Sequence, residues 1–144
     1  MPTVTVPINY LAVFVAALVN MVIGSIWYGP LLGKAWMKEI GMKPMKMTDK
    51  VKKQMMYQYS LMFVGSLFMS WVLANAVIFA NAYMHMEGVW AGALTGFFNW
   101  LGFVAPVTLG SVLWEGKSWK MWCINNGYYL ITLVAMGKIL AMWG

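Results

Sequence analysis

The stretch GVWAGALTGFFNW, residues 88–100, has a glycine at every fourth position: Gly88, Gly92 and Gly96. Residues four apart in a helix lie on the same face, so these glycines form one face without side chains. In a bilayer, helices gain no hydrophobic free energy by associating, and they pack closely where small residues let their backbones approach. We therefore predict that Gly92 and Gly96 lie in a contact between helices.

The chain around this stretch has the composition of a membrane protein. Of its 144 residues, 62% are hydrophobic and only 10% are charged, whereas soluble domains contain about 25% charged residues. A helix needs about 20 apolar residues to cross the hydrocarbon core of a bilayer. Four apolar segments exceed this length, at about residues 8–28, 56–82, 89–113 and 121–143. The sequence predicts an all-α protein, a four-helix transmembrane bundle formed by a single domain, residues 1–144.

The basic residues indicate how the four segments are oriented. All ten are lysines; seven lie in the loop predicted at about residues 29–55, and Lys117 and Lys120 lie between the third and fourth segments. Lysine-rich loops stay in the cytoplasm. Both chain ends and the His85–Glu87 connection are therefore predicted on the non-cytoplasmic side.

The same lysines define the expected partners. Each lysine near an anionic membrane surface contributes about 1 kcal/mol of attraction, so we expect contact with the bilayer and with anionic lipid head groups. Nucleic acid is not expected as a partner, because the loop has no arginine for bidentate phosphate contacts and no interleaved aromatic residues. The residues predicted to contact lipid at the interface are Trp27, Tyr28, Lys34, Trp36, Lys117 and Trp119.

Local signals suggest where helices begin and bend. Thr48 or Asp49 is suited to cap a helix over Lys50–Tyr59, so that the second helix begins in the cytoplasm. Pro106 has no amide hydrogen and leaves the carbonyl of Gly102 without its helical partner, which predicts a kink in the third segment.

Polar residues inside the apolar segments have two interpretations. Asn20 and Gly24 share a face of the first segment, and Asn99 lies on the glycine face of the third. Such amides either bond between helices, at about 0.6 kcal/mol each, or line a pore. An unpaired amide at this depth costs several kcal/mol, so both interpretations remain open for these three residues and for Pro106.

Several classes of function are disfavoured by what the chain lacks. It has one histidine and one cysteine, whereas a zinc site takes three or four His, Cys or carboxylate ligands. None of the four apolar segments contains a carboxylate to serve as base or proton carrier. The methionines of MKPMKM, residues 42–47, alternate with lysines that repel a metal cation. We expect no metal, no cofactor and no catalysis.

A short motif occurs twice. GKAW at residues 33–36 returns as GKSW at residues 116–119, each between two apolar segments. The chain is thus either one bundle without internal repeats or a duplicated two-helix unit. In the second case the two halves would be parallel repeats about an axis along the membrane normal.

Three longer stretches resemble a known family. They are INYLAVFVAALVNMVIGSIWYGPLLGKAWMK (8–38), GFVAPVTLGSVLWEGKSWK (102–120) and INNGYYLITLVAMGKIL (124–140), with WYGP at 27–30 and EGKSW at 115–119 as the most specific parts. They are similar to the bacterial family known as domain of unknown function 1761. The resemblance implies a small four-helix protein of the bacterial inner membrane, with no established activity and no catalytic residue to transfer.

Two hypotheses for function follow. The first is a non-enzymatic membrane protein that self-associates or serves as an accessory subunit of a larger membrane complex, since small-residue faces on a short chain favour protein partners. The alternative is a homo-oligomeric channel or carrier for a small solute, lined by Asn20 and Asn99. A third possibility, an enzyme that uses Glu115 and Lys117 on lipid, has less support. The first two differ in whether the asparagines are packed or face a wet cavity.

Overall fold

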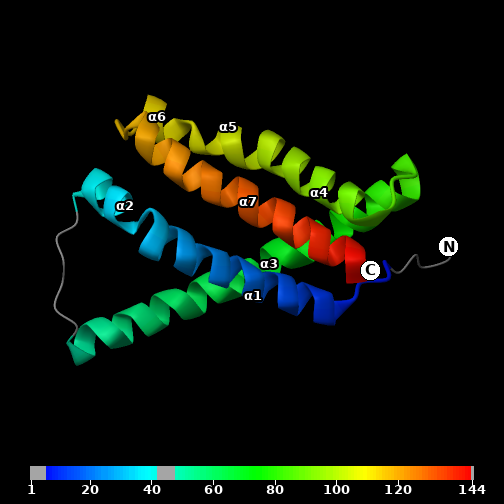
Figure 1. Cartoon of the computed structure of the whole chain (residues 1–144), viewed down its shortest axis with the longest axis horizontal. Helices are drawn as coiled ribbons and strands as arrows, with labels where there is room; N and C mark the ends of the chain where they lie inside the picture. The colour runs from blue at the N-terminus through cyan, green and yellow to red at the C-terminus, as the bar shows by residue number, and fades with distance from the viewer. Residues whose placement is uncertain (1–5, 42–47, 144) are drawn as a thin grey trace.

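The computed structural model describes residues 6–41 and 48–143, and this part of the chain is helical, with no β-strand (Figure 1). In chain order the elements are α1 (Tyr10–Ile26), η1 (Trp27–Leu31), α2 (Gly33–Ile40), α3 (Asp49–Met84), α4 (Gly88–Asn99), the π-helical η2 (Trp100–Val104), α5 (Ala105–Thr108), α6 (Gly110–Leu113) and α7 (Trp119–Trp143). The backbone of η1 is kinked at Gly29, whose φ of −104° and ψ of −106° are not helical.

The segment predicted as a loop at residues 29–55 is largely helical where it is described. α2 lies within it, and Gly41 ends α2 with a positive φ of 71°, a conformation that glycine adopts without strain. α3 then begins at Asp49, where the Thr48 hydroxyl accepts a hydrogen bond from the Val51 amide at 3.3 Å. The predicted cap is thus confirmed, and α3 starts well before its apolar part.

The third apolar segment is interrupted near Pro106, as its missing amide hydrogen requires. α4 passes into the π-helical η2, where the Ala105 amide bonds to the Trp100 carbonyl. A short α5 follows, with Pro106 in its first turn, and then α6. The hydroxyl of Thr108 donates to the Val104 carbonyl at 2.7 Å and so helps to hold this broken region together.

α7 packs along the middle of the molecule, against α4 on one side and α1 and α3 on the other (Figure 1). Two contacts show that it runs antiparallel to α1 over its full length. The Asn9 amide before α1 donates to the Trp143 carbonyl at the end of α7, at 2.8 Å. At the other end, the Trp27 indole donates to the Ile124 carbonyl at 2.9 Å.

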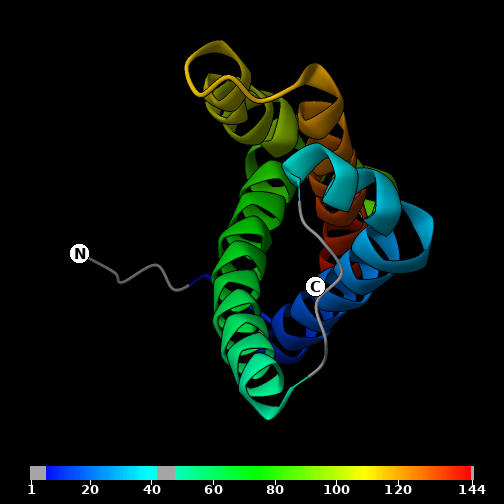
Figure 2. The same cartoon turned by 90° about the vertical axis from the view of Figure 1, so that its left-hand side faces the viewer.

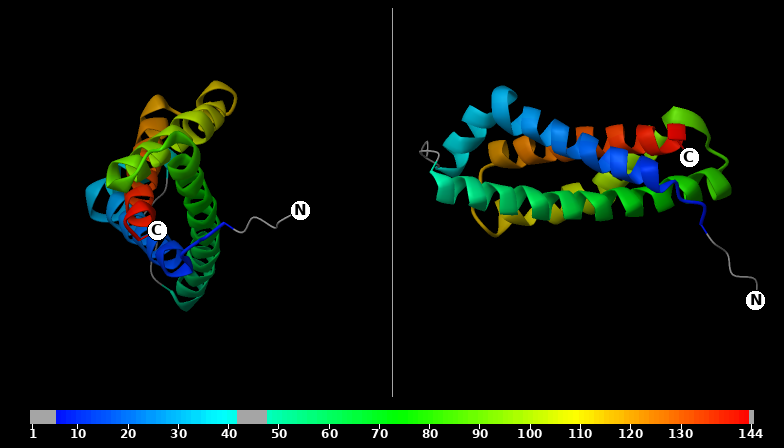
Figure 3. Two further views of the ribbon diagram at one scale, coloured as in Figure 1. Left: turned by 90° about the vertical axis from the view of Figure 1, so that its right-hand side faces the viewer. Right: turned by 90° about the horizontal axis from the view of Figure 1, so that it is seen from below.

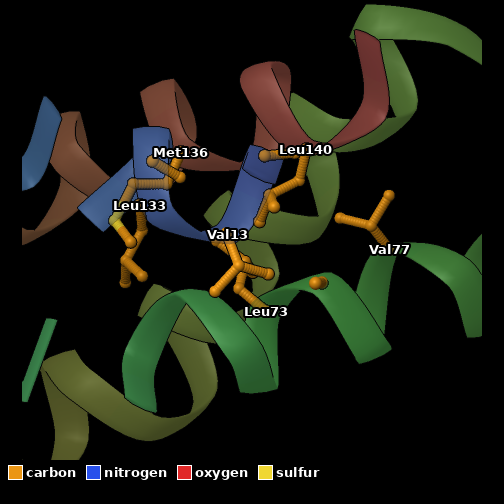
Figure 4. Packing of buried hydrophobic residues seen from close by; sticks show 9 residues of the cluster. Val13, Leu73, Val77, Leu133, Met136 and Leu140 are labelled. Atoms are coloured by element: carbon orange, nitrogen blue, oxygen red, sulfur yellow. The ribbon is translucent and has the colours of Figure 1, made fainter. Parts of the chain in front are cut away.

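A small apolar core joins α1, α3 and α7. Figure 4 shows that its side chains point toward one another from the three helices. Ala16 and Met136 at its centre are completely buried. The labelled members are Val13, Leu73, Val77, Leu133, Met136 and Leu140.

α3 departs from the other helices toward its start, as the views along the molecule and from below show (Figures 2 and 3). Its buried residues begin only at Ser66. The preceding turns carry mostly exposed side chains, including Met56, Tyr57 and Leu61.

Three helical segments, Tyr10–Leu31, Asp49–Met84 and Gly88–Leu113, are long and apolar enough to cross a membrane. Sequence analysis predicted four. α7 has 25 residues, but it is not among the three, because it includes two asparagines, two tyrosines and two lysines. Its buried polar residues Asn126, Tyr128 and Thr132 point into the protein, which reconciles its composition with its central position.

The described lysines gather at one end of the molecule, hereafter the lysine-bearing end, where α2, α6 and the starts of α3 and α7 lie (Figure 1). Lys138 is the exception, near the end of α7. The two copies of the repeated motif both lie at this end but differ in structure: Gly33 is buried at the start of α2, whereas Gly116 has a φ of 73° in a turn. The structure therefore does not confirm the internal repeat.

Candidate binding site at the lysine-bearing end

The WYGP motif ties the end of α1 to α7. Besides the bond from Trp27 to Ile124, the Tyr28 hydroxyl donates to the Asn125 side-chain oxygen at 2.7 Å. A Cβ at Gly127 would lie 3.0 Å from the Trp27 ring, so this glycine makes room for the indole. Trp27 and Tyr28, predicted to contact lipid, are thus partly buried against α7. The structure shows that these two residues contact the first turns of α7 and help to position them.

The region around Pro106 holds the opposite side of α7. The Asn126 amide donates to the Thr108 hydroxyl at 2.9 Å and to the Trp122 carbonyl at 3.1 Å. The Trp100 indole, at the first residue of η2, donates to the Asn126 backbone carbonyl at 3.1 Å. Asn126 is 2% exposed, so Trp100 and Thr108, on either side of Pro106, both bond to a buried residue of α7.

Between these two contacts lies a cavity of about 380 Å³, within the range of about 300–1,000 Å³ typical of small-molecule sites. We call it the α5–α7 cavity. It is lined by Val107, Thr108, Gly110, Ser111, Trp114, Glu115, Lys117, Trp122, Asn125, Asn126 and Tyr129.

The α5–α7 cavity is rich in hydrogen-bond donors that have no partner within residues 6–41 and 48–143. The Asn125 oxygen is occupied by Tyr28, but its amide nitrogen makes no hydrogen bond there. The Tyr129 hydroxyl is likewise unengaged. The Trp122 indole nitrogen is buried without a partner among these residues, and a buried unpaired donor costs about 1–3 kcal/mol.

One charge of each sign lies at the rim of the cavity. The Lys117 ammonium is 3.7 Å from the Glu115 carboxylate, and both side chains are more than half exposed. The turn at Gly116, with its positive φ, brings the two side chains of the EGKSW motif together. An exposed pair of this kind stabilises a protein by only about 0–1 kcal/mol, so both charges remain available to a ligand.

The neighbouring residues of EGKSW join α2 to α7. The Ser118 hydroxyl donates to the Glu39 carboxylate at 2.6 Å, and the Lys120 ammonium lies 3.9 Å from the same carboxylate. Trp36 of α2 packs edge-on against Tyr28, with ring centroids 5.4 Å apart. Of the other predicted lipid contacts, Lys34 is exposed and Trp119 is 56% exposed.

Asn20 lies in a polar layer at the centre of the molecule. Its amide donates to the Ser66 hydroxyl of α3, and its oxygen accepts from the hydroxyls of Tyr128 and of Thr132, the latter at 2.7 Å. Asn20 is 1% exposed. Gly24 is part of the same layer, since a Cβ there would lie 3.2 Å from the Tyr128 hydroxyl. Both residues serve packing between α1, α3 and α7.

The two other predicted packing groups lie elsewhere. A Cβ on Gly92 would lie 2.1 Å from the Gly137 carbonyl oxygen, and one on Gly96 would lie 2.2 Å from the Leu133 carbonyl oxygen. The glycine face of α4 is therefore in backbone contact with α7. Asn99 is only partly buried and donates to Thr95 of its own helix at 2.8 Å. The structure thus separates Asn99 from Asn20.

The predicted pore asparagines do not line the α5–α7 cavity. Sequence analysis named Glu115 and Lys117 of its lining, but it did not assign Asn125, Asn126 or Tyr129 to a binding site. The signal was the run INNGYY at 124–129, which interrupts an apolar helix with asparagines and tyrosines. Gly137, the partner of the α4 glycines, was also missed, although it lies four residues after Leu133 on one face.

No metal centre is formed by the described part of the chain, where no three His, Cys, Asp or Glu side chains meet. The methionine cluster at 42–47 lies outside the described residues.

Taken together, the apolar spans, the buried polar layer and the cavity define a helical protein compatible with a membrane location. The comparisons identify its family. The chain belongs to DUF1761, a family of proteins of unknown function, whose family model matches residues 11–141. No curated protein and no solved structure matches the chain. Both of its most specific motifs, WYGP and EGKSW, lie beside the α5–α7 cavity.

Proposed function

We propose that the chain is a four-helix transmembrane bundle of the bacterial inner membrane, with its lysine-bearing end in the cytoplasm. The 25 residues of α7 measure about 37 Å at 1.5 Å per residue, enough for a core of about 30 Å. The contacts from Asn9 to Trp143 and from Trp27 to Ile124 support a fourth crossing, because they align α7 with the whole of α1.

Within this frame, we propose that the protein is non-enzymatic and binds a small polar ligand in the α5–α7 cavity, as a solute carrier does. One observation carries the proposal: the free amide of Asn125 lines the cavity and is positioned by the Tyr28 hydroxyl of WYGP. If the Asn125 amide faced tightly packed side chains, its bond to Tyr28 would serve packing alone. It instead lines a cavity, where a positioned donor is suited to bind a ligand.

This proposal modifies both earlier hypotheses. Gly92 and Gly96 are used within the chain, so they no longer favour a protein partner. Asn20 is fully engaged by Ser66, Tyr128 and Thr132 and does not favour a pore. The solute-binding hypothesis is supported by different residues, those of the α5–α7 cavity. Among the described residues that line it, Glu115 and Lys117 alone are charged, and they pair with each other rather than activate a nucleophile.

The test is a ligand screen on purified protein in detergent, read as the shift of the thermal unfolding midpoint on adding small polar and zwitterionic compounds. We expect at least one class to stabilise the wild type and to lose this effect in Asn125→Leu. Asn75→Leu is the matched control, since Asn75 bonds only to Trp71 of its own helix. Stabilisation that persists in Asn125→Leu, or no stabilising ligand at all, would reject the site.

Self-association, or service as an accessory subunit, is a second candidate, and it has its own supporting observation. Residues 56–65 of α3 have no buried side chain in the described part of the chain, and apart from Phe63, which packs edge-on against Phe14, their side chains are exposed and accessible to lipid or to another helix. Extraction in a mild detergent and mass determination of the native particle test it. A stoichiometric dimer or larger complex supports the candidate, and a monomeric mass contradicts it.

A further inference from the structure

We infer that the α5–α7 cavity takes a zwitterionic head group with a primary ammonium and a phosphate, as in an ethanolamine phospholipid. The inference rests on the proposed ligand-binding function and names the chemistry of its ligand. It is carried by the arrangement of opposite charges at the rim and unengaged donors on the wall of one cavity.

The charges favour a ligand that is neutral overall. Glu115 and Lys117 give the rim one negative and one positive group, 3.7 Å apart. A simple anion would be repelled by Glu115, and a simple cation by Lys117. A ligand with both charges satisfies each of them, and the exposed pair that it replaces is weak.

The donors indicate where the phosphate lies. Asn125 and Tyr129 offer an amide and a hydroxyl without partners among the described residues, and both line the cavity with Lys117. Three donors that line one cavity suit an oxyanion. Among the described residues of the lining, Glu115 alone is anionic, and its carboxylate is the group available to accept hydrogen bonds from a primary ammonium.

The surroundings of the cavity suit a lipid. Trp114 lines it and is 88% exposed, as interfacial tryptophans are. Val107 also lines it and is 74% exposed on the outer face of α5, and its neighbour Phe103 is 73% exposed. A head group in the cavity would thus have its acyl chains along an apolar outer surface. The same chemistry is present in free phosphoethanolamine, which lacks these chains.

The experiment measures binding to the full-length protein in detergent micelles. Four probes are titrated: a short-chain ethanolamine phospholipid, its choline analogue, its glycerol analogue, and phosphoethanolamine. We expect the ethanolamine lipid to bind at least about tenfold more tightly than the other two lipids, because the quaternary ammonium of choline cannot donate to Glu115 and glycerol has no cation.

Variants of Glu115 and Lys117 test whether the preference for the ethanolamine lipid depends on the charges at the rim of the cavity. Glu115→Gln is expected to remove the preference for ethanolamine over choline, and Lys117→Gln to weaken both about equally. Glu87→Gln and Lys138→Gln, which lie at the other end of the molecule, are the matched controls and should keep the preference. Both rim side chains are exposed, so circular dichroism and unfolding midpoints should be unchanged.

Each outcome decides between sources and proposals. Binding of phosphoethanolamine as tightly as the lipid supports the zwitterion chemistry with a soluble ligand as its source. Equal binding of the three lipids, or a preference that survives Glu115→Gln, overturns the inference. If another ligand class then stabilises the wild type but not Asn125→Leu, the proposed ligand-binding function stands and only the ethanolamine head group is rejected. If no ligand class does so, the proposed function and the further inference both fail.

Discussion

Three glycines form the contact between α4 and α7. Gly92 and Gly137 face each other so closely that a Cβ on either would lie 2.1 Å from the carbonyl oxygen of the other. The obstacle in each case is backbone, which cannot rotate aside. Gly96, one turn further along α4, meets the Leu133 carbonyl in the same way. The distance between α4 and α7 is therefore fixed by the absence of side chains.

The first prediction concerns this contact. Gly137→Ala should separate α4 from α7 and lower the free energy of unfolding by about 1–3 kcal/mol, as overpacked cores do. The measurement is the thermal unfolding midpoint in detergent. Gly65→Ala is the control: a Cβ there meets nothing within 4 Å, and alanine favours the helix by about 0.5–1 kcal/mol. Equal midpoints for the two variants would contradict the contact.

The second prediction separates the two asparagines. Asn20→Leu removes three bonds between helices, and we expect it to destabilise the protein by about 2 kcal/mol, at about 0.6 kcal/mol per bond. Asn99→Leu should cost much less, because Asn99 bonds only to its own helix. Unfolding midpoints of the two variants, compared in one detergent, decide the matter. A larger loss for Asn99→Leu would show that the polar layer is not where the structure places it.

At the scale of elements, the breaks in the first and third apolar segments have similar effects. Trp27 and Tyr28 lie just before the kink at Gly29 and bond to the start of α7, and Trp100 lies where α4 passes into η2 and bonds to Asn126. Single π-helical turns are frequent at functional sites. Here the two breaks flank the α5–α7 cavity.

The third prediction tests η1 through Tyr28. Tyr28→Phe keeps the ring against Trp36 and Tyr128 but frees Asn125 from its hydrogen bond. Because Asn125 then samples several orientations, affinity for a ligand of the α5–α7 cavity should fall by about threefold to tenfold. The measurement is a ligand titration, with Tyr83→Phe at the far end of α3 as control. Unchanged affinity would show that η1 does not position the site.

The fourth prediction concerns the start of α3. Thr48→Ala removes the acceptor of the Val51 amide, which costs about 1 kcal/mol of helix stability. Hydrogen exchange at Val51 should become faster by roughly fivefold, whereas Ser60→Ala, whose hydroxyl only bonds back to Met56, should leave it unchanged. Equal exchange in both variants would place the true start of the helix elsewhere.

At the scale of the whole molecule, the fifth prediction tests the four crossings. In a Cys123→Ser background, a cysteine at Glu87 should react with an impermeant thiol reagent in intact spheroplasts. A cysteine at Lys52 should react only in inverted vesicles, since the two positions lie at opposite ends of α3. The same approach at Met142 places the end of α7. Labelling of positions 52 and 142 from the same side would mean that α7 does not cross.

Structural features that depend on neighbouring residues in the chain could be predicted from the sequence. The glycine spacing predicted the helix contact at Gly92 and Gly96, whereas Gly88 has a φ of 84° and no atom within 4 Å of a Cβ built on it. The cap at Thr48 was confirmed because it needs only neighbouring residues. The cavity could not be predicted in this way. Asn125 and Tyr28 are 97 positions apart, and their contact depends on how the end of α1 packs against α7. Likewise, the pairing of Gly92 with Gly137 depends on which helix lies beside α4.

The central position of α7 has a consequence for biosynthesis. It is the last of the described helices to leave the ribosome, yet it contacts α4, α1 and α3. Until α7 is synthesised, Asn20 lacks two of its bonding partners, the hydroxyls of Tyr128 and Thr132, and the glycines of α4 have no helix to pack against. A nascent chain that stalls before α7 therefore carries an amide oxygen without these partners, and the packing of α1, α3 and α4 is completed by a segment that is made after all three.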